Sequence, residues 1–423
     1  MKEVNAAIIT IGDELLIGQT IDTNSAFISR ELNSIGIWVK RRIAIGDVKE
    51  QILSALKEQA NDCDLVIITG GLGPTADDIT KPTLCEFFHT ELVVNEEARQ
   101  NVINIFTNLN RPVTERNLKQ AEVPASCTVL QNLRGTAPGM WFEINESGRK
   151  VSYISLPGVP HEMKGLMIHS VIPRLKKSLE LPSVVHRTLI TSGIGESSIA
   201  DILVDFENNL PPDIKLAYLP AYGLVRLRLT GRSSNKEEEE KKVQGYFDQL
   251  KPLVKEWMVA DEDISLEMAV SQLLKRKKKT MATAESCTGG YIAHLITSHA
   301  GSSSIFNGSV VAYANQVKEN ILGVKSQTLQ DFGAVSEETV KEMVTGVIKA
   351  VGSDYAISTS GIMGPEGGTN EKPVGTVWMA VGNREKIKTY KAFFRFDRER
   401  NIEMTAHTAL TLLYRFIKEA EGE

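Results

Sequence analysis

Short apolar runs alternate with amphipathic stretches along the first part of the chain. Strands are predicted over residues 6–11, 38–45 and 65–69, where apolar and β-prone side chains follow one another. Helices are predicted over residues 23–35, 48–60 and 77–88, where apolar side chains recur at helical spacing. This alternation predicts a parallel sheet covered by helices on both faces, and we assign it to a domain spanning residues 1–172.

Two later changes in the pattern predict further domains. Pro173 and Pro182 bracket a short helix-like segment, and residues 183–259 beyond them form a small α+β domain. A linker near residues 260–265 opens the last domain, residues 265–423. Strands of that domain are predicted over residues 280–284, 309–312, 355–359 and 376–381, with helices between them. We therefore expect an α/β protein, in which two α/β layered domains with mostly parallel sheets are joined by a small α+β domain.

Composition narrows the class of protein. The 423 residues are 42% hydrophobic and 24% charged, which is typical of globular chains, and the net charge of −5 argues against a general nucleic-acid binder. No stretch reaches the roughly 18 apolar residues that a membrane span needs. The four cysteines, Cys63, Cys85, Cys127 and Cys287, form no CxxC pair, so we expect neither a zinc site nor disulfides. A reducing cytoplasm fits this pattern.

The segment Ala-Glu-Ser-Cys-Thr-Gly-Gly at residues 284–290 joins a predicted strand to a predicted helix. Small residues at such a junction let a ligand approach the backbone, and N–H groups near residues 287–289 suit an anion or a developing oxyanion. Ser286 is the candidate nucleophile. In the alternative reading, Ser286 or Thr288 only caps the helix and the glycines only permit the turn.

Two further segments of the last domain carry candidate chemistry. Tyr313 lies at the end of a predicted strand, and Lys318 lies on the turn that follows. Residues 360–368 form a long loop rich in glycine and proline, which includes Gly361 and Gly364. So many glycines cost backbone entropy and favour close approach to a ligand, although an ordinary loop is the alternative.

The first domain has its own candidate site in the loops that follow its strands. The first of these loops contains Gly12, Asp13 and Glu14, and Asn24 follows shortly after. The second contains Gly70, Gly71, Gly73 and Thr75, followed by Asp77 and Asp78. Glycine-rich loops after parallel strands let N–H groups reach a phosphate, and carboxylates suit a hard divalent cation. Alternatively, Thr75 caps a helix and the aspartates complement its dipole.

The C-terminal segments resemble the nicotinamide-mononucleotide deamidase domain of the CinA family. The match covers residues 284–290, 313–318, 333–336 and 360–375 in order. The resemblance implies hydrolysis of nicotinamide mononucleotide to nicotinate mononucleotide and ammonia without a cofactor, with Ser286, Lys318 and Tyr313 as catalytic residues. Lys318 can act as the base if burial or a neighbouring charge lowers its pKa, either directly or through Tyr313. Cys287 is the rival nucleophile.

The resemblance also suggests contacts to the substrate. Expected substrate-binding residues are Cys287, Thr288, Gly289, Gly361, Gly364 and Arg398. The segment 396–400 fits the family pattern loosely, with Phe396 where a glycine is usual, so the choice between Arg398 and Arg400 for the phosphate stays open. A surface ion pair is the alternative role for these arginines.

The first two domains resemble the remaining parts of CinA proteins. With residues 156–163, the N-terminal loops resemble the molybdopterin-binding fold, which implies a pyrophosphatase that uses Mg²⁺ or a similar divalent metal to cleave ADP-ribose. Nucleotide contacts are then expected from Gly12, Asn24, Gly70, Gly71, Gly73 and Thr75. Metal ligands are expected from Asp13, Glu14, Asp77 and Asp78. Residues 183–259 resemble a KH-like domain, but Ser-Gly-Ile-Gly-Glu at 192–196 departs from the RNA-clamping GxxG loop. We therefore expect a spacer or dimerisation role there and no nucleic-acid partner.

Three hypotheses follow for the whole chain. The leading one is a cytoplasmic, homodimeric, bifunctional hydrolase of pyridine-nucleotide salvage, with nicotinamide mononucleotide and ADP-ribose as substrates and no membrane partner. In the second, the N-terminal domain only binds a nucleotide or a pterin. In the third, the protein is a non-enzymatic adaptor for competence. The amidase mechanism requires the Lys318 nitrogen to lie within reach of the Ser286 oxygen.

Overall fold

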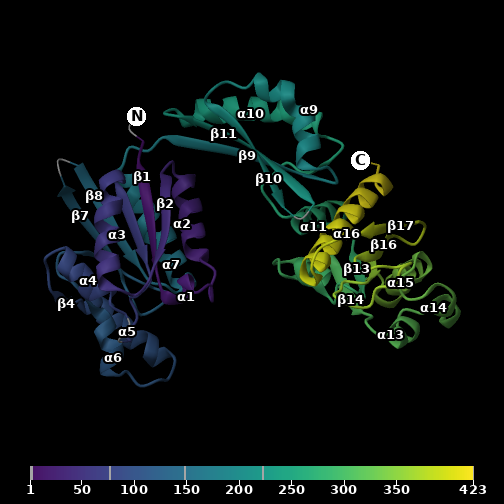
Figure 1. Cartoon of the computed structure of the whole chain (residues 1–423), viewed down its shortest axis with the longest axis horizontal. Coiled ribbons are helices and arrows are strands. Elements are labelled where there is room, and N and C mark those ends of the chain that lie inside the picture. The colour runs from purple at the N-terminus through teal and green to yellow at the C-terminus, as the bar shows by residue number, and fades with distance from the viewer. Residues whose placement is uncertain (1–2, 76–77, 147–148, 222, 423) are drawn as a thin grey trace. The chain divides into compact units, whose positions relative to one another are not determined.

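The structure, a computed structural model of the chain, describes residues 3–75, 78–146, 149–221 and 223–422 (Figure 1). The chain divides into two compact units, Met1–Val185 with Gly231–Glu240, and His186–Thr230 with Lys241–Glu423. The predicted α/β class is confirmed, because the chain combines several mostly parallel sheets with helices. The predicted three-domain bounds stay a prediction. In the part of the chain that the structure describes, no helix has the length and apolar character needed to cross a membrane.

The sheet of the first unit has six strands in the order β2-β1-β3-β8-β7-β6. Its strands are β1 (Asn5–Ile11), β2 (Trp38–Ile45), β3 (Leu65–Thr69), β6 (Thr128–Leu130), β7 (Gly139–Glu146) and β8 (Arg149–Leu156). Strands β2, β1, β3 and β8 run parallel to one another, β7 is antiparallel to β8, and β6 is antiparallel to β7. The carboxyl ends of β1 and β3 therefore meet at one edge, where the candidate loops begin.

Strand β1 shows how this sheet is buried on both faces. Ala6 and Ile8 pack into one core, and Ile9 and Ile11 pack into a second. Successive side chains of a strand point to opposite faces, so an uninterrupted apolar run fills both cores. Helices α2 (Thr23–Ser34), α7 (Pro160–Leu166) and α8 (Ile172–Ser178) cover the first face, and α3 (Lys49–Asp62) and α4 (Thr80–Phe87) cover the second. The unit also contains α1 (Asp13–Leu16), β4 (Leu92–Val94), α5 (Glu96–Asn108), α6 (Glu115–Leu118), η1 (Lys119–Ala121), β5 (Glu122–Pro124) and the π-helix η2 (Met167–Val171).

The helix predicted over residues 77–88 begins later than expected. Helix α4 starts at Thr80, because the preceding segment is held as a loop. The Asp78 carboxylate accepts hydrogen bonds from the N–H groups of Gly73 and Thr75, at 2.8 and 2.9 Å. A side chain that bonds its own loop competes with helix formation.

A four-stranded sheet in the order β10-β11-β9-β12 follows, most of which belongs to the second unit. Its elements are β9 (Ser183–Ser192), α9 (Glu196–Asn208), β10 (Ile214–Ala221), β11 (Leu224–Ser233), α10 (Lys236–Leu253) and β12 (Met258–Ala260). The loop after β9 packs on the C-terminal helix: the Arg415 guanidinium donates to the Ser192 carbonyl at 2.7 Å. A side chain at Gly193 would lie 2.9 Å from that guanidinium, so the glycine permits this close packing.

The C-terminal sheet has five strands in the order β14-β13-β15-β16-β17. Its strands are β13 (Met281–Glu285), β14 (Phe306–Val311), β15 (Tyr355–Gly361), β16 (Thr376–Gly382) and β17 (Ile387–Phe393). Strand β13 is parallel to both neighbours, β16 is antiparallel to β15, and β17 is antiparallel to β16. β17 was not predicted, because its lysine-rich sequence lacks an apolar run.

Helices cover both faces of this sheet (Figure 1). On β13, Met281 packs with α11 (Leu266–Lys277), α12 (Tyr291–Thr297) and α16 (Arg398–Ala420), whereas Ala282 and Ala284 pack on α15 (Glu337–Val351). The remaining elements are η3 (Ser302–Ser304), α13 (Asn315–Asn320) and α14 (Ser326–Phe332). Because β13, β14 and β15 are parallel, the loops after all three strands begin at the same edge.

Candidate functional site

Ser286 directly follows the buried strand β13 at this edge. Its backbone N–H donates to the Thr359 carbonyl of β15 at 3.0 Å, and the residue is 9% exposed. Gly289 and Gly290 have φ angles of +63° and +97°, which are costly for other residues. The glycines therefore permit a sharp turn into α12, and the turn leaves Ser286 at its start.

Lys318 lies opposite Ser286, on the short helix α13. Its side chain is almost completely buried, and its Nζ lies 3.1 Å from Ser286 Oγ, 2.7 Å from the Ala312 carbonyl oxygen and 3.3 Å from the Tyr313 carbonyl oxygen. No carboxylate of the described residues lies within ion-pair distance of this nitrogen. Burial lowers the pKa of Lys318, because removal from water disfavours the ammonium.

The three contacts of Lys318 define what its neutral form does. A neutral amine carries two hydrogens and one lone pair, and a carbonyl oxygen can only accept a hydrogen bond. The Ala312 and Tyr313 carbonyls therefore take the two hydrogens, and the lone pair faces the Ser286 hydroxyl. This arrangement suits proton transfer from Ser286 to Lys318.

Glu285 organises the turn and was not identified from the sequence. Its carboxylate is fully buried and accepts hydrogen bonds from the N–H groups of Gly290, Ile292 and Ala293, at 2.9–3.1 Å. These groups form the start of α12, so the helix N-terminus is closed to a ligand. The signal in the sequence was an acidic residue directly before a glycine-rich strand–helix turn.

Of the N–H groups predicted to hold an oxyanion, the one of Gly289 is used by the turn itself. The Gly289 N–H donates to the Ser286 carbonyl at 3.2 Å and closes the turn. Within the described chain, the N–H groups of Cys287 and Thr288 donate to no other residue. These two donors lie next to Ser286 and suit the charge that develops on an attacked carbonyl oxygen.

The side chains of Cys287 and Thr288 face inward, not toward a ligand. Cys287 belongs to the apolar core, and burial raises the pKa of its thiol to about 12. The hydroxyl of Thr288 lies 2.8 Å from that of Thr359 and is buried. The expected substrate contacts of Cys287 and Thr288 can therefore come only from their backbone. A thiol with so high a pKa stays protonated and is a poor rival nucleophile.

The Tyr313 side chain lies at the mouth of the site and meets Arg398. The residue is 64% exposed, and its hydroxyl accepts a hydrogen bond from Arg398 Nη2 at 3.1 Å. Arg398 Nη1 donates to the Gly364 carbonyl at 2.8 Å. Tyr313 thus contacts Lys318 through its carbonyl, while its hydroxyl is held by Arg398. The geometry favours a direct transfer between Ser286 and Lys318 over a relay through the Tyr313 hydroxyl.

The structure separates the two candidate arginines. The Arg400 guanidinium lies over the Phe396 ring, 4.3 Å from its centroid, whereas Arg398 reaches the loop that contains Gly361 and Gly364. A Cβ on Gly361 would lie 2.8 Å from Val377, and Gly364 has a φ of +87°, so both glycines are required by the loop itself. Arg398 is therefore the arginine that faces the candidate site.

Asn401 fixes this loop and carried no signal in the sequence. Its side chain is fully buried in α16, and its Nδ2 donates to the carbonyls of Met363 and Phe396 at 3.0 Å. Its Oδ1 accepts from the Phe396 N–H at 3.2 Å. Asn401 thereby joins the Gly/Pro loop to the start of the helix that carries Arg398.

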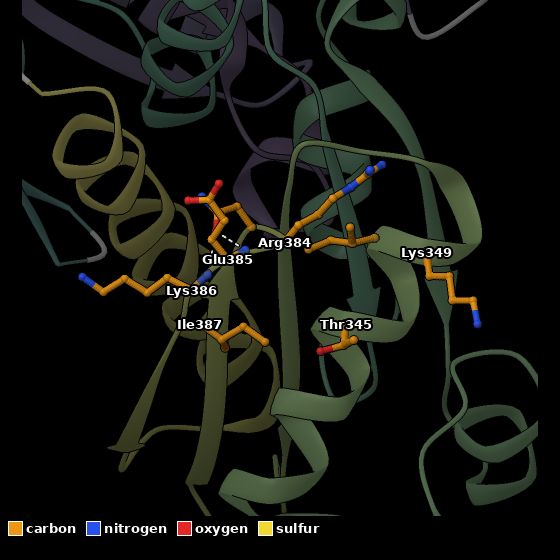
Figure 2. Close-up of a pocket in the computed structure, with 8 residues that line it drawn as sticks. Thr345, Lys349, Arg384, Glu385, Lys386 and Ile387 are labelled. Carbon is orange, nitrogen blue, oxygen red and sulfur yellow. Dashed lines mark hydrogen bonds between the residues drawn. The ribbon is translucent and has the colours of Figure 1, made fainter.

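A cavity of about 580 Å³ lies at the opposite edge of the same sheet (Figure 2). It is lined by Thr345 and Lys349 of α15 and by the turn between β16 and β17, from Asn383 to Ile387. That turn follows the end of β16 that lies away from Gly361. None of the predicted site residues lines this cavity.

In the first unit, a pocket of about 110 Å³ lies beyond the carboxyl ends of β1 and β3. Its lining includes the predicted residues Glu14 and Asn24, together with Thr69 and Gly158. Asn24 Nδ2 donates to the Gly158 carbonyl at 2.7 Å and to Thr69 Oγ1 at 3.3 Å. Gly12 lies beneath the Glu14 side chain, where a Cβ would approach a carboxylate oxygen to 2.5 Å.

The predicted phosphate cradle of the second N-terminal loop is largely occupied. The N–H groups of Gly73 and Thr75 already donate to Asp78, and the Gly70 N–H donates to the Leu156 carbonyl at 3.2 Å. A Cβ on Gly70 would lie 2.1 Å from the Ile11 carbonyl oxygen, and one on Gly71 would lie 2.2 Å from the Thr80 hydroxyl. In this arrangement the loop itself uses the N–H groups of Gly70, Gly73 and Thr75, and their contact to a phosphate stays a prediction.

The predicted metal ligands do not form a site within the described residues. Asp77 lies outside them. Asp78 accepts from its own loop, and Asp13 Oδ1 accepts from the Asp47 N–H at 3.3 Å. No group of three His, Cys, Asp or Glu side chains in the described chain is placed to hold a metal ion. All four cysteines are free thiols.

Three family models match consecutive parts of the chain. They are the "CinA C-terminal domain" over residues 263–417, the "Probable molybdopterin binding domain" over residues 7–177 and the "Damage-inducible protein CinA KH domain" over residues 186–260. A CinA-like protein from Cytophaga hutchinsonii is 48% identical over 99% of both chains. A CinA-like protein from Flavobacterium psychrophilum is 43% identical over 98% of this chain and 99% of its own. A solved CinA superfamily protein from Klebsiella pneumoniae is 36% identical over 36% of this chain and 96% of its own, with a TM-score of 0.36.

Proposed function

The chain belongs to the CinA family, and from that premise we propose that its C-terminal domain hydrolyses the carboxamide of nicotinamide mononucleotide. The observation that carries the proposal is the 3.1 Å contact between Lys318 Nζ and Ser286 Oγ, in a buried site where none of the described carboxylates pairs with the lysine. Ser–Lys pairs are known variants of the nucleophile–base arrangement of hydrolases. The substrate itself is inferred from the resemblance to the deamidase domain.

The proposed reaction has two half-reactions, formation and hydrolysis of an acyl-enzyme, and Lys318 moves the proton in both. The neutral Lys318 amine takes the Ser286 proton while Ser286 Oγ attacks the carboxamide carbon. The N–H groups of Cys287 and Thr288 stabilise the oxyanion. Lys318 returns the proton to the leaving nitrogen, the C–N bond breaks, and ammonia departs from an acyl-enzyme. Lys318 then takes a proton from water, and the resulting hydroxide attacks the ester carbon. The bond between that carbon and Ser286 Oγ breaks, Lys318 returns the proton to Ser286 Oγ, and nicotinate mononucleotide is released.

Arg398 is the proposed contact for the phosphate of the substrate. It reaches the Gly/Pro loop through the Gly364 carbonyl and holds the Tyr313 hydroxyl, so its guanidinium is oriented at the mouth of the site. A planar guanidinium bonds phosphate oxygens in pairs. The exposed Tyr313 ring at the same mouth offers a face to the pyridine of the substrate.

The direct experiment is incubation of the full chain with nicotinamide mononucleotide, followed by measurement of ammonia and nicotinate mononucleotide. We expect equimolar products without added metal, and an acid-quenched sample with a nicotinoyl-nucleotide ester on Ser286. Failure to release ammonia from the folded protein would leave the non-enzymatic adaptor as the better hypothesis. An ester on Cys287 would contradict the assignment of the nucleophile.

A second proposed function concerns the first unit. The pocket beyond β1 and β3, lined by Glu14, Asn24 and Thr69, supports binding of a nucleotide such as ADP-ribose by the N-terminal domain. Cleavage of ADP-ribose with Mg²⁺ is implied by the family resemblance, and the described carboxylates supply no metal site for it. Release of AMP from ADP-ribose with Mg²⁺, and not without it, tests this activity; binding without cleavage would favour a domain that only binds its ligand.

A further inference from the structure

The cavity between α15 and the turn that joins β16 to β17 takes no part in the proposed amidase reaction (Figure 2). Its volume of about 580 Å³ lies within the range of roughly 300–1,000 Å³ that is typical of small-molecule pockets. It lies at the edge of the sheet opposite Ser286, so a ligand bound there is separate from the amidase substrate. The side chains that line the cavity decide which ligand fits.

Two elements of regular geometry form the walls of the cavity. Thr345, Ile348 and Lys349 are spaced by three and four residues on α15, so the helix presents them on one face. In the opposite wall, the Asn383 side chain accepts hydrogen bonds from the N–H groups two and three residues further along the turn, at 3.0 and 2.8 Å. An asparagine that bonds the backbone of its own turn stabilises that turn. Both walls are therefore held in place by the fold itself.

The unpaired charge of the cavity is positive. The side chains of Lys349 and Arg384 have no hydrogen-bond or ion-pair partner in the described chain. Lys386 instead forms an ion pair with Glu419 of α16 at 2.9 Å. Figure 2 shows Arg384 extending to the side on which Lys349 lies. The Glu385 carboxylate and the Lys386 ammonium extend to the other side. An ammonium and a guanidinium are thus the charges that face a ligand.

The neutral residues of the lining add a hydrogen-bond acceptor and apolar surface. The Thr345 hydroxyl donates its one hydrogen to the Lys341 carbonyl at 3.1 Å, so toward the cavity it can only accept. Ile348 and Ile387 supply the apolar surface. A matching ligand has an anionic end, a hydroxyl that donates a hydrogen bond, and carbon atoms that gain by leaving water.

We propose that this cavity binds the phosphate monoester of a sugar, either a sugar phosphate or a nucleoside monophosphate, with its phosphate on Arg384 and Lys349. A phosphate monoester carries roughly two negative charges near neutral pH, which matches the two unpaired cations. The guanidinium can donate two parallel hydrogen bonds to phosphate oxygens, and the ammonium adds a point charge. A sugar hydroxyl donates to Thr345, and the carbon atoms of the ligand pack on the isoleucines. A carboxylate, with a single charge, would leave one cation unpaired.

The test follows the methyl signals of Ile348 and Ile387 by NMR, in the full chain labelled at isoleucine methyl groups. The probes are AMP and ribose 5-phosphate, compared with adenosine and ribose, which lack the phosphate, and with inorganic phosphate, which lacks the sugar. We expect at least one of the two phosphate monoesters to bind about tenfold or more tightly than either fragment of it. The AMP and ribose 5-phosphate arms distinguish a nucleotide from a sugar phosphate.

A double variant locates the phosphate. Lys349→Ala combined with Arg384→Ala should weaken binding of the monoester by about tenfold or more, because it removes the charged donors. Lys215→Ala combined with Lys255→Ala is the matched control. It removes the same charge from two exposed positions outside the cavity and should change the affinity by less than about twofold.

A single variant locates the sugar. Thr345→Val keeps the shape of the side chain and removes the acceptor, so it should weaken binding of ribose 5-phosphate by about threefold or more and leave inorganic phosphate unaffected. Arg398→Ala, at the amidase site, should leave the shifts of the two isoleucine signals unchanged. Binding is measured directly, so the result does not depend on amidase activity.

Several outcomes would overturn the proposal. They are isoleucine signals that do not move, equal binding of the phosphorylated and unphosphorylated probes, and unchanged affinity in the double variant. Inorganic phosphate that binds as tightly as both monoesters would also overturn it, because the sugar would then have no part in recognition.

Discussion

Two buried lysines, one in each unit, differ in what surrounds them. Lys318 is 1% exposed and faces a serine hydroxyl and two carbonyls. Lys81, at the start of α4, is 8% exposed and donates to the Gln120 carbonyl at 2.8 Å. Burial lowers the pKa of both side chains, in Lys81 to about 8, although Glu122 and Asp78 oppose the shift there.

The comparison shows that a lowered lysine pKa does not by itself make a base. A general base must lie within hydrogen-bond reach of the proton that it removes. Lys318 meets this condition through Ser286. Lys81 faces a carbonyl, which has no proton to give, so its burial affects only stability. A titratable group with a shifted pKa marks a functional site when a reactive partner also lies within reach.

The largest expected effect comes from removing the nucleophile. Ser286→Ala should reduce deamidation of nicotinamide mononucleotide by about 10⁴-fold or more, since no other hydroxyl contacts Lys318 in the described chain. The measurement is the steady-state rate of ammonia release. Ser298→Ala, a solvent-facing serine at the end of α12, is the matched control and should retain full activity. Retained turnover in Ser286→Ala would move the nucleophile elsewhere.

The next effect compares the two lysines directly. Lys318→Met should reduce kcat by about 10³-fold, because methionine fills the same space without a lone pair for the serine proton. Lys81→Met should leave kcat unchanged. Comparable losses in both variants would show that the two buried lysines are not functionally different and would reject Lys318 as the base.

A smaller effect is expected at the mouth of the site. Arg398→Ala should raise KM by about tenfold or more, with a smaller change in kcat, because it removes a contact to the substrate phosphate. Arg400→Ala should change KM by less than about twofold, since its guanidinium lies over Phe396. A rise in KM confined to Arg400→Ala would reverse the assignment.

The smallest effect concerns stability and belongs to Lys81. Its folded pKa of about 8 lies below the ordinary value of 10.5, so between these values the unfolded chain binds more protons. Stability of the first unit should therefore rise with pH from 8 to 10.5, by a few kcal/mol at most. Hydrogen exchange of β3 and α4 measures this rise, which should be absent in Lys81→Met. An identical rise in the variant would assign it to another group.

Much of the fold was predictable because the apolar runs are long enough to determine it. The bounds of β3 match the predicted run, since a buried parallel strand is apolar on both faces. The bounds of β2 also match, although most of the side chains of this edge strand are exposed. Strand β17 was missed because this edge strand, interrupted by Lys388 and Lys391, lacks an apolar run. The start of α4 was misplaced because the competing bonds of Asp78 are not visible in a helical pattern.

The candidate site was predictable where a motif carried it, and not where packing did. The segment 284–290 identified Ser286, and the segment after β14 identified Lys318. Glu285 bonds N–H groups of the turn that follows it, so its place before a glycine-rich turn was a signal to which no role had been assigned. Asn401 bonds the Met363 carbonyl, which only the tertiary fold brings near, so an asparagine in an amphipathic helix gave no indication of its role.

The most direct test of the central claim is the pH dependence of kcat/KM for nicotinamide mononucleotide. The amine of Lys318 must be neutral to take the Ser286 proton, so kcat/KM should rise with pH through one deprotonation, with an apparent pKa below the ordinary lysine value of 10.5. The residual activity of Lys318→Met should lack this rise. A flat profile in the unaltered protein, or the same rise in the variant, would contradict the assignment of Lys318 as the base.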